Sequence, residues 1–404
     1  MNEVGSSRSA NPSNPSAQPL KGRDIVCFSN DWDGDPLSKT HLMRLLAQDN
    51  RILWVNSLGN RAPGATAHDA RRLLRKAWKA LAGVREVEPN LFVLSPLAVP
   101  VFGSEAVGAV NRVALGLQVR RAMKGLGFQR PVVWAFLPAA QWVARSLEPD
   151  LLVYHCVDEF SAFSDAPGEA IARMEKQLVR EADLVIASAQ RLYDSKRALN
   201  PRTVLVRHGV DYRHFARALD RATPVPEDVA GLPRPVLGFF GLVADWVDVD
   251  LLEALAKANP GGSVVLVGRV RTDVSRLRRA TNVHLLGPKP YATLPGYAKA
   301  FDVGLLPFRV NELTLNSNPL KVREYLAAGL PVVSTAIPEV EQLGQCLVAH
   351  DTPQFLAQVR RALRVPGPRR ARSDRIRSES WEARLEEIRG HVAALESSRR
   401  RLAR

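Results

Sequence analysis

The sequence predicts an α/β protein with two parallel-sheet domains. Strand-like apolar runs alternate with helical runs along most of the chain, which is the pattern of parallel strands joined by crossover helices. The runs fall into two sets, separated by the Pro-rich residues 217–235. A length of 404 residues also exceeds what one ordinary hydrophobic core holds. We therefore expect two Rossmann-like, doubly wound α/β domains.

The first domain is expected at residues 23–216 and the second at residues 236–366, with residues 217–235 as the linker between them. A Ser-, Asn- and Pro-rich leader at residues 1–22 is expected to be disordered. The first set of strand-like runs is DIVCFS (24–29), RILWV (51–55), VVWAFL (132–137), LLVYHCV (151–157), LVIAS (184–188) and TVLVRHG (203–209). The second set is VLGFFG (236–241), VVLVG (264–268), VHLLG (283–287), VGLLPF (303–308) and VVST (332–335).

Residues 367–404 differ in composition from both domains. A Pro- and Arg-rich stretch comes first, and SWEARLEEIRGHVAAL (380–395) then repeats apolar residues with helical periodicity. The final SSRRRLAR is expected to be a solvated basic tail. The apolar stripe of this helix consists of Trp381, Leu385, Ile388, Val392 and Leu395.

Composition narrows the class of partner without selecting one. The net charge of +15 suits an anionic partner such as a membrane surface, a nucleic acid or a nucleotide. No apolar run approaches the ~18–20 residues that span a bilayer, and the N-terminal residues lack the apolar core of a secretory signal. Three widely spaced cysteines suit a reducing compartment. We therefore expect a cytoplasmic protein.

The run NSNPLKVREYLAAGLPVVS (316–334) is the most informative stretch of the chain. Asn318 is a good N-cap, Pro319 suits the first helical position, and Gly329 suits the end of the helix. Lys321 and Glu324 are three residues apart, so they share a helix face.

One cation and one carboxylate would thus stand together at a helix start that already favours an anion. A sugar nucleotide needs both groups, a positive charge for its diphosphate and a carboxylate for its ribose hydroxyls. The alternative is an ordinary αβ unit with a surface ion pair.

This run resembles the donor-site signature of GT-B glycosyltransferases, and most closely that of the teichuronic acid biosynthesis enzymes, in which Pro-Leu-Lys and Glu-Tyr-Leu-Ala-Ala-Gly-x-Pro-Val-Val recur. The resemblance extends from about residue 24 to residue 381. It implies a GT-B fold, in which the two domains face each other across a cleft and a C-terminal helix crosses back to the first domain. It further implies a nucleotide sugar as substrate without a cofactor. It also implies that Lys321 contacts the diphosphate and Glu324 the ribose.

One position departs from the family pattern of two Glu residues separated by seven others. Glu324 matches the second Glu, but Asn316 stands where the first is expected. An amide can donate hydrogen bonds to the sugar, yet it cannot bring negative charge to an oxocarbenium-like centre. The retaining mechanism of relatives is therefore not carried over unchanged. Glu312 is near enough in sequence to substitute.

Three further residues of the second domain are expected at the donor. Gly241 follows a strand and precedes a helix capped by Asp248 or Asp250, so its turn suits a diphosphate. Relatives often carry Arg and Lys after this glycine, whereas here the chain has Ala-Asp-Trp (244–246), which shifts the phosphate contact to Lys321 and Arg269. Gly287 would flank the base. The alternative for Gly241 is an ordinary βα turn. The alternative for Arg269 and Gly287 is that their segments are sheet strands without a ligand contact.

In the first domain, Gly34 would allow a sharp loop towards the cleft, with Ser38 capping the next helix. Asp31-Trp32-Asp33 superficially matches the metal motif of the other glycosyltransferase fold, but two Rossmann halves argue against that fold, so no metal site is expected.

His155 and Asp158 follow a strand whose carboxyl end should face the acceptor. The segment around them resembles the family motif Tyr-Asp-x-Val-Asp-Asp-x-Ser-x-Phe, and Asp158 would accept the proton of the acceptor hydroxyl. The alternative is a helix-capping Asp and a buried, hydrogen-bonded His.

Two basic stretches of the first domain suggest a membrane. RRLLRKAWKALAGVR (71–85) has no acidic residue and places Trp78 on its apolar stripe, and residues 101–128 mix apolar residues with Arg and Lys. The alternative is that both stripes pack on the domain's own sheet.

The sequence therefore predicts a glycosyltransferase that moves a sugar from a nucleotide sugar to a saccharide hydroxyl, with a lipid-linked acceptor in bacterial surface polysaccharide assembly. Contact with the inner face of the cell membrane is expected, and no nucleic-acid partner, because no nucleic-acid-binding motif is recognised. The alternatives are a nucleotide-sugar epimerase of the same fold and a non-catalytic binding protein of GT-B shape.

Overall fold

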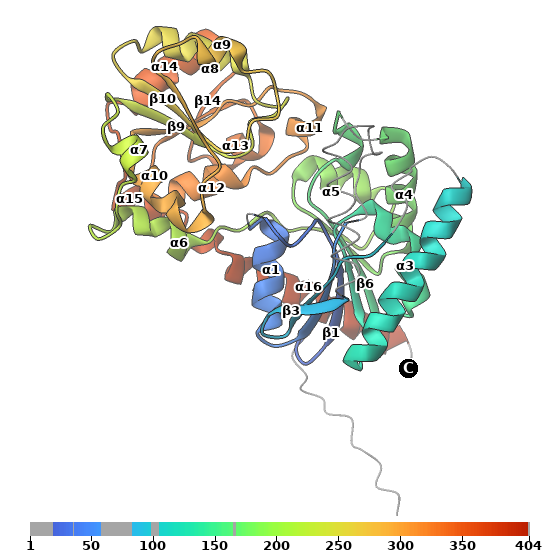
Figure 1. Cartoon of the computed structure of the whole chain (residues 1–404). Coiled ribbons are helices and arrows are strands. Elements are labelled where there is room, and N and C mark those ends of the chain that lie inside the picture. Colours follow the sequence, from blue (N-terminus) through green and yellow to red (C-terminus); the bar gives the residue numbers. More distant parts are fainter. Residues whose placement is uncertain (1–18, 35, 58–82, 98–104, 165–166, 403–404) are drawn as a thin grey trace, which may run out of the picture.

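The computed structural model describes residues 19–34, 36–57, 83–97, 105–164 and 167–402. Two α/β domains lie one beyond the other, and the chain passes between them near α6 and again at the start of the C-terminal helix α16 (Figure 1). The two-domain α/β architecture predicted from the sequence is confirmed.

The first domain is built on one mixed sheet with the strand order β3-β4-β2-β1-β5-β6-β7-β8. Neighbouring strands are parallel except β3, which pairs antiparallel with β4 at the edge. The strands are β1 (Asp24–Phe28), β2 (Arg51–Val55), β3 (Val84–Glu88), β4 (Leu91–Leu94), β5 (Val132–Ala135), β6 (Leu151–Cys156), β7 (Leu184–Ala187) and β8 (Thr203–Leu205).

The second domain has a fully parallel sheet with the strand order β11-β10-β9-β12-β13-β14. In this order the chain reverses direction across the sheet between β9 and β12, as in dinucleotide-binding domains. The strands are β9 (Val236–Phe240), β10 (Ser263–Val267), β11 (Val283–Gly287), β12 (Val303–Leu306), β13 (Val332–Thr335) and β14 (Leu347–Ala349).

Helices connect the parallel strands and cover both faces of each sheet (Figure 1). Those of the first domain are α1 (Ser38–Ala47), α3 (Glu105–Leu126), α4 (Gly168–Glu181) and α5 (Gln190–Arg197), with 3₁₀ turns η1 (Pro138–Trp142), η2 (Arg145–Leu147) and η3 (Phe160–Ala162). Those after β8 are α6 (Tyr212–Ala216), η4 (Arg217–Leu219), α7 (Glu227–Ala230), α8 (Val249–Ala258), α9 (Ser275–Arg278), η5 (Tyr291–Thr293), α10 (Leu294–Ala300), α11 (Glu312–Leu315), α12 (Leu320–Ala327), α13 (Pro338–Leu343), α14 (Thr352–Ala362), α15 (Arg370–Asp374), η6 (Arg377–Glu379) and α16 (Trp381–Leu402).

Each sheet has a hydrophobic core on both of its faces, which explains why its strands read as continuous apolar runs. All eleven predicted strands are present within a few residues of their expected ends. Three strands were missed. β3 is an edge strand whose residues are half-buried or exposed. β4 is largely buried but has only four residues, and β14 has only three, so none of the three produces a long apolar run.

The C-terminal helix α16 crosses back to the first domain, as the family resemblance implied. Its residues Leu385, Ile388 and Val392 are buried in the same core as β1 and α1. The predicted basic tail continues α16 as far as Leu402. Arg400, Arg401 and Leu402 are exposed, as expected of a solvated tail, whereas Arg399 forms an ion pair with Asp183 at 2.5 Å.

The predicted leader and the predicted linker both contribute packed residues where the structure describes them. Leu20, inside the predicted leader, is buried in the first core, whereas residues 1–18 lie outside the described residues. In the predicted linker, Ala218 and Val229 are buried in the core of the second domain, together with Val210 and Phe215 before it. By packing, the chain therefore joins the second domain from about residue 210.

In the part of the chain that the structure describes, none of the helices combines the length and the apolar character needed to span a membrane.

Candidate functional site

Helix α12 brings the predicted donor-binding pair together. Lys321 Nζ lies 2.9 Å from Glu324 Oε2, one helical turn away. Glu324 is only 5% exposed, so the Lys321–Glu324 pair is not an ordinary ion pair on an open surface. The helix ends as predicted, with Gly329 at a φ of +83°, a left-handed conformation that favours glycine. The structure thus confirms the shared face of Lys321 and Glu324.

The start of this helix differs from the prediction. Pro319 is the N-cap, and no side chain caps the helix, so the capping role expected for Asn318 was wrong. Asn318 instead uses its amide between the domains, where Nδ2 donates to the Ser188 carbonyl at 2.7 Å and Oδ1 accepts from Arg323 Nη1 at 2.6 Å. Its own carbonyl lies 2.8 Å from His208 Nδ1. The side-chain amide of Asn318 is therefore already hydrogen-bonded to protein groups, and not free to bind a nucleotide sugar.

Gly241 lies directly beside the pair on α12. A Cβ built on Gly241 would be 3.4 Å from Lys321 Cε, so the loop after β9 closes against the lysine. The next strand end approaches even more closely. A Cβ on Gly268 would lie 1.8 Å from the Gly241 carbonyl oxygen, and the Gly268 N–H donates to the Gly287 carbonyl at 2.8 Å. Gly268, which the sequence reasoning missed, therefore links the ends of β9, β10 and β11.

Arg269 and Gly287 lie at this same edge of the second sheet. The Arg269 side chain is exposed, and its carbonyl accepts from the Val243 N–H at 2.9 Å. Gly287 has a φ of +70° and open space where a Cβ would stand. Both residues are available to a ligand, and their roles towards phosphate and base stay predictions.

A cluster of aromatic side chains, which the sequence reasoning missed, stands between Lys321–Glu324 and the first domain. His214 stacks on Tyr291 with ring centroids 4.2 Å apart, and His41 stacks on Trp381 at 5.8 Å. Tyr291 Oη lies 3.5 Å from His41 Nε2, across the domain junction.

Burial lowers the pKa of His41 to about 4, and burial also raises the pKa of Tyr291, with the Glu324 carboxylate adding to the rise. Both rings are therefore neutral near pH 7. Single His and Tyr residues far apart in the sequence give no signal that they meet in the fold.

Asn316 occupies the end of the short helix α11. Its Nδ2 donates to the Glu312 carbonyl at 2.7 Å, and the Glu312 side chain is exposed. The Asn316 amide is thus hydrogen-bonded to α11. Among the described residues, neither Asn316 nor Glu312 forms a hydrogen bond or ion pair with Glu324.

Asp158 stands at the carboxyl end of β6 in the first domain, where the sequence predicted it. Burial raises the pKa of Asp158 to about 6, although the nearby Lys39 ammonium opposes the rise. The neighbouring 3₁₀ turn η3 has Glu159 at its N-cap and no side-chain cap, so Asp158 does not act as the capping residue considered as its alternative. A carboxylate with this pKa is ionised at neutral pH and can accept a proton.

His155 lies deeper on the same strand. It is 4% exposed and stacks on Phe136, with ring centroids 5.0 Å apart. Its Nδ1 has no hydrogen-bond partner among the described residues, which differs from the hydrogen-bonded core His considered as an alternative. Burial, followed by the charges of His208 and Lys39, lowers the pKa of His155 to about 3. The ring is therefore neutral and cannot serve as a general acid at pH 7.

The loop after β6 reaches across to the second domain. Ser164 Oγ donates to Asp245 Oδ2 at 2.5 Å, and Phe163 contacts Trp246 edge-to-face with centroids 6.2 Å apart. The residues that replace the Arg and Lys of relatives therefore contact the first domain. The loops that carry Asp158 and Gly241 accordingly lie on facing edges of the two sheets.

Gly34 lies in the exposed loop between β1 and α1, with open space around it. Helix α1 begins at Ser38, with Leu37 at the N-cap and no side-chain cap, so the capping role expected for Ser38 was wrong by one position. Its hydroxyl is one residue too far along the helix to reach back.

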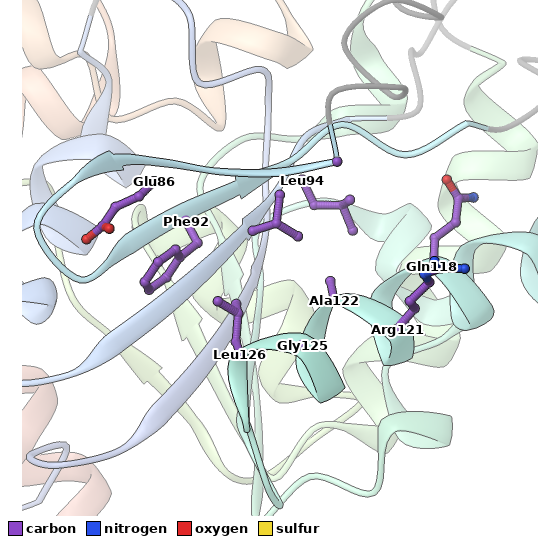
Figure 2. Close-up of a pocket in the computed structure, with 10 residues that line it drawn as sticks. Glu86, Phe92, Leu94, Gln118, Arg121, Ala122, Gly125 and Leu126 are labelled. Atoms are coloured by element: carbon purple, nitrogen blue, oxygen red, sulfur yellow. The ribbon is translucent and has the colours of Figure 1, made fainter.

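A hollow of about 600 Å³ lies away from all these residues, between α3 and the β3–β4 ribbon. Figure 2 shows Phe92, Leu94, Ala122 and Leu126 around it, with Glu86 and Arg121 at its sides. Its lining is mostly apolar, with Glu86, Gln118 and Arg121 as polar members, and contains none of the predicted site residues.

Comparison with known proteins gives these features a family context. Residues 234–364 match the model of the family described as glycosyl transferases group 1. A Bacillus subtilis (strain 168) protein provisionally named a teichuronic acid biosynthesis glycosyltransferase, TuaH, is 26% identical over 284 residues, which cover 64% of this chain and 71% of that protein.

Solved structures show the same fold at low identity. The sucrose-phosphate synthase of Thermosynechococcus elongatus has a TM-score of 0.66 at 17% identity and covers 93% of this chain and 100% of its own. The Anabaena protein Alr3699/HepE, solved in complex with UDP-glucose, has a TM-score of 0.59 at 16% identity and also covers 93% of this chain and 100% of its own.

Proposed function

Because the chain is a group 1 glycosyltransferase of GT-B type, we propose that it moves a sugar from a nucleotide sugar to a saccharide hydroxyl. The observation that carries this proposal is the pairing of Lys321 with Glu324 at 2.9 Å beside the Gly241 turn. A cation and a carboxylate on one face, next to a backbone loop that a diphosphate can approach, suit the two polar ends of a nucleoside diphosphate.

In this proposal the second domain holds the donor. Glu324 accepts hydrogen bonds from the ribose hydroxyls, and Lys321 turns from Glu324 to the diphosphate when the donor binds. Arg269, at the end of β10, adds positive charge, and Gly287 leaves room beside the base. Removing the charged partner of such bonds costs about 1.5–3 kcal/mol each.

The first domain receives the acceptor. Asp158, ionised at neutral pH, takes the proton of the attacking hydroxyl. His155 contributes a neutral ring beside it and shapes the pocket. Since Asn316 replaces the first Glu of the family motif, we propose no charged group at that position and leave the stereochemical outcome to experiment.

The acceptor is proposed to be a lipid-linked saccharide in the assembly of a bacterial surface polysaccharide. The relative named for teichuronic acid biosynthesis supports this class of acceptor. The basic stretch 71–85 that first suggested a membrane lies outside the described residues up to position 82. The second basic stretch is described as α3, which lies on the flank of the first domain away from the second (Figure 1).

The outer face of α3 supports a contact with an anionic membrane. Val110, Val113 and Leu117 recur at helical spacing and are 60%, 60% and 59% exposed. The helix also exposes Arg112, Arg120, Arg121 and Lys124, and it has no acidic residue after Glu105. We propose that this face rests on the inner face of the cell membrane.

A donor screen tests the central proposal. Nucleoside diphosphate release is measured from a panel of nucleotide sugars, with and without membrane-extracted saccharide acceptors. Release that depends on one donor and on the acceptor is expected. Release of nucleotide without acceptor dependence, or interconversion of the donor sugar, would favour the epimerase reading, and binding without any turnover would favour a non-catalytic protein.

A further inference from the structure

Lys39 is a buried cation at the centre of the first domain. It belongs to the first turn of α1, which follows β1. Between β1 and β5 the chain changes the side of the sheet on which it adds strands. In open α/β sheets, ligands bind at the carboxyl ends of the strands at such a switch point. Lys39 is therefore placed where the fold itself provides a crevice.

The surroundings of Lys39 do not neutralise it by direct contact. The side chain is 4% exposed, and Nζ donates to the neutral Asn30 Oδ1 at 2.6 Å. The rings of Phe136 and Phe160 lie 6.0 and 5.7 Å from Nζ. Among the described residues no carboxylate oxygen approaches Nζ within 4.0 Å, although Asp158 is near enough to influence its pKa.

Such an arrangement costs stability. Burial lowers the pKa of Lys39 to about 8, only partly offset by the Asp158 carboxylate. By comparison, Lys196, a second lysine that is buried among the described residues of this domain, lies 2.7 Å from Glu175 and 3.2 Å from Glu159. A buried ammonium is ordinarily paired in this way, so Lys39 lacks the partner that Lys196 has.

Two histidine ring nitrogens near Lys39 lack a hydrogen-bond partner among the described residues. His155 Nδ1 and His208 Nε2 are buried and make no hydrogen bond to any described residue. Lys39 is close enough to both rings to lower their pKa values. His155 reaches this region from β6, and its ring stacks on Phe136, which also borders Lys39. Within electrostatic range of Lys39, the His155 and His208 rings thus each keep one nitrogen without a partner among the described residues.

We propose that Lys39 binds an anionic oxygen group, a phosphate or a carboxylate, of a substrate held in the first domain. This inference rests on the proposed function and gives it a second anion-binding residue, opposite Lys321. The group has two sources, the diphosphate of the donor or an acidic group on the acceptor saccharide. Both share the same chemistry, so the experiment has one arm for each.

The donor arm compares a nucleoside diphosphate with its nucleoside. Of UDP, ADP, GDP and dTDP, the one that wild-type protein binds most tightly is titrated against wild type, Lys39→Met and Lys39→Arg. If the donor supplies the anion, Lys39→Met loses about tenfold or more in affinity for the diphosphate, with little change for the nucleoside. Lys39→Arg retains most of the affinity because it keeps the charge.

The acceptor arm uses protein saturated with that nucleoside diphosphate. Binding of methyl glucuronide and glucose 6-phosphate is compared with binding of methyl glucoside and glucose by NMR titration. If the acceptor supplies the anion, Lys39→Met loses the preference for the charged sugar of each pair. Lys176→Met is the matched control, because Lys176 is an exposed lysine on α4 of the same domain.

The pH dependence of the wild type provides a measurement that no variant can compromise by misfolding. Affinity for the charged probe that depends on Lys39 should be nearly constant up to about pH 7, fall by about half near pH 8, and decrease further as the ammonium loses its proton. The groups facing Lys39 do not titrate between pH 7 and 9. Asp158 has a pKa of about 6, burial lowers the pKa values of His155 and His208 to about 3, and burial raises the pKa of Cys27 far above this window.

A selective loss in either arm supports the proposal and names the source of the anion. The proposal is overturned if folded Lys39→Met binds all the probes within about twofold of wild type, or if Lys39→Arg loses as much as Lys39→Met. If wild-type protein binds none of the nucleotides, the proposed function fails, and this inference fails with it.

Discussion

Lys321 and Glu324 neutralise each other across one turn of α12, with Nζ 2.9 Å from Oε2. The pair is partly buried, since Glu324 is 5% exposed and Lys321 lies under the loop of Gly241. A nucleotide-sugar donor bound at this site must replace the Lys321–Glu324 contact, with its diphosphate bound to Lys321 and its ribose bound to Glu324. The two residues should therefore have separable effects on the two ends of the nucleotide.

Glu324→Ala should weaken binding of the nucleoside and the nucleoside diphosphate alike. The ribose would lose bonds to a charged acceptor worth about 1.5–3 kcal/mol each, so affinity should fall by roughly tenfold or more. Isothermal titration calorimetry measures this loss. Glu253→Ala is the control, because Glu253 on α8 also forms ion pairs, with Lys257 of the same helix and with Arg276 of α9, but is not a predicted site residue. Unchanged affinity in a folded Glu324→Ala protein would refute the ribose assignment.

Lys321→Met should discriminate between the two ligands. The variant keeps the side chain as far as Cε beside the Phe240 ring, whose centroid lies 5.3 Å from Lys321 Nζ, and removes the charged ammonium. We expect a loss of about tenfold for the nucleoside diphosphate and a small loss for the nucleoside. The exposed Lys257 on α8 provides the control variant, Lys257→Met. Equal losses for both ligands would mean that Lys321 acts on the base or on folding.

The fold was predictable from the sequence because buried parallel strands produce long apolar runs. β2, β11 and β13 were found with their observed ends. β3 was not, since its residues are largely half-buried or exposed. The close approach of Gly268 to Gly241 just beyond the ends of β10 and β9 joins residues distant in sequence, and no local pattern reveals it.

The candidate site was predictable only where its residues are neighbours in sequence. Lys321 and Glu324 share a helix turn, so their spacing sufficed. Lys39 resembled any helix-start lysine, and only the burial that the fold imposes on it makes it unusual. Asn318 matched a capping pattern, but its side-chain amide is hydrogen-bonded elsewhere. Nδ2 donates to the carbonyl of Ser188, which is distant in sequence, and Oδ1 accepts from Arg323 on α12.

Asp158→Asn should leave nucleoside diphosphate affinity nearly intact and reduce transfer by roughly 10²–10⁴-fold. The wild-type rate should also depend on pH. Because the pKa of Asp158 is about 6, the base form is complete above that value, and the rate should fall about tenfold per unit below it. This acid limb should disappear in the variant. Steady-state rates between pH 5 and 8 check both points, and near-wild-type transfer would remove Asp158 from the mechanism.

Gly268→Ala and Gly287→Ala should behave differently although both glycines have positive φ. A Cβ at Gly268 would overlap the Gly241 carbonyl oxygen at 1.8 Å, whereas nothing lies within 4 Å of one at Gly287. Gly287→Ala should therefore cost only the backbone strain, about 1–2 kcal/mol. Gly268→Ala must displace the loop of Gly241 and should lose nucleotide binding or stability. Thermal unfolding together with calorimetry checks this order, and equal effects would contradict the close approach.

The last prediction concerns the outer face of α3. Each basic side chain near an anionic bilayer adds about 1 kcal/mol of attraction, which salt screens, and insertion of apolar side chains adds a contribution that salt does not remove. We therefore expect the protein to sediment with vesicles that contain phosphatidylglycerol but not with neutral phosphatidylcholine vesicles. High salt should reverse the binding only in part.

Replacing Val110, Val113 and Leu117 by Ser should remove the salt-resistant part of this binding, and replacing Arg112, Arg121 and Lys124 by Gln should remove the salt-sensitive part. Replacing Val310 and Val365, which are exposed apolar residues of the second half of the chain, by Ser is the matched control and should change neither. Nucleotide affinity should persist in all three proteins, because α3 lies far from α12 (Figure 1). If both α3 variants sediment as the wild type does, the membrane contact lies elsewhere. If the wild-type protein ignores anionic vesicles altogether, the acceptor need not be presented by a membrane, and the lipid-linked acceptor loses its structural support.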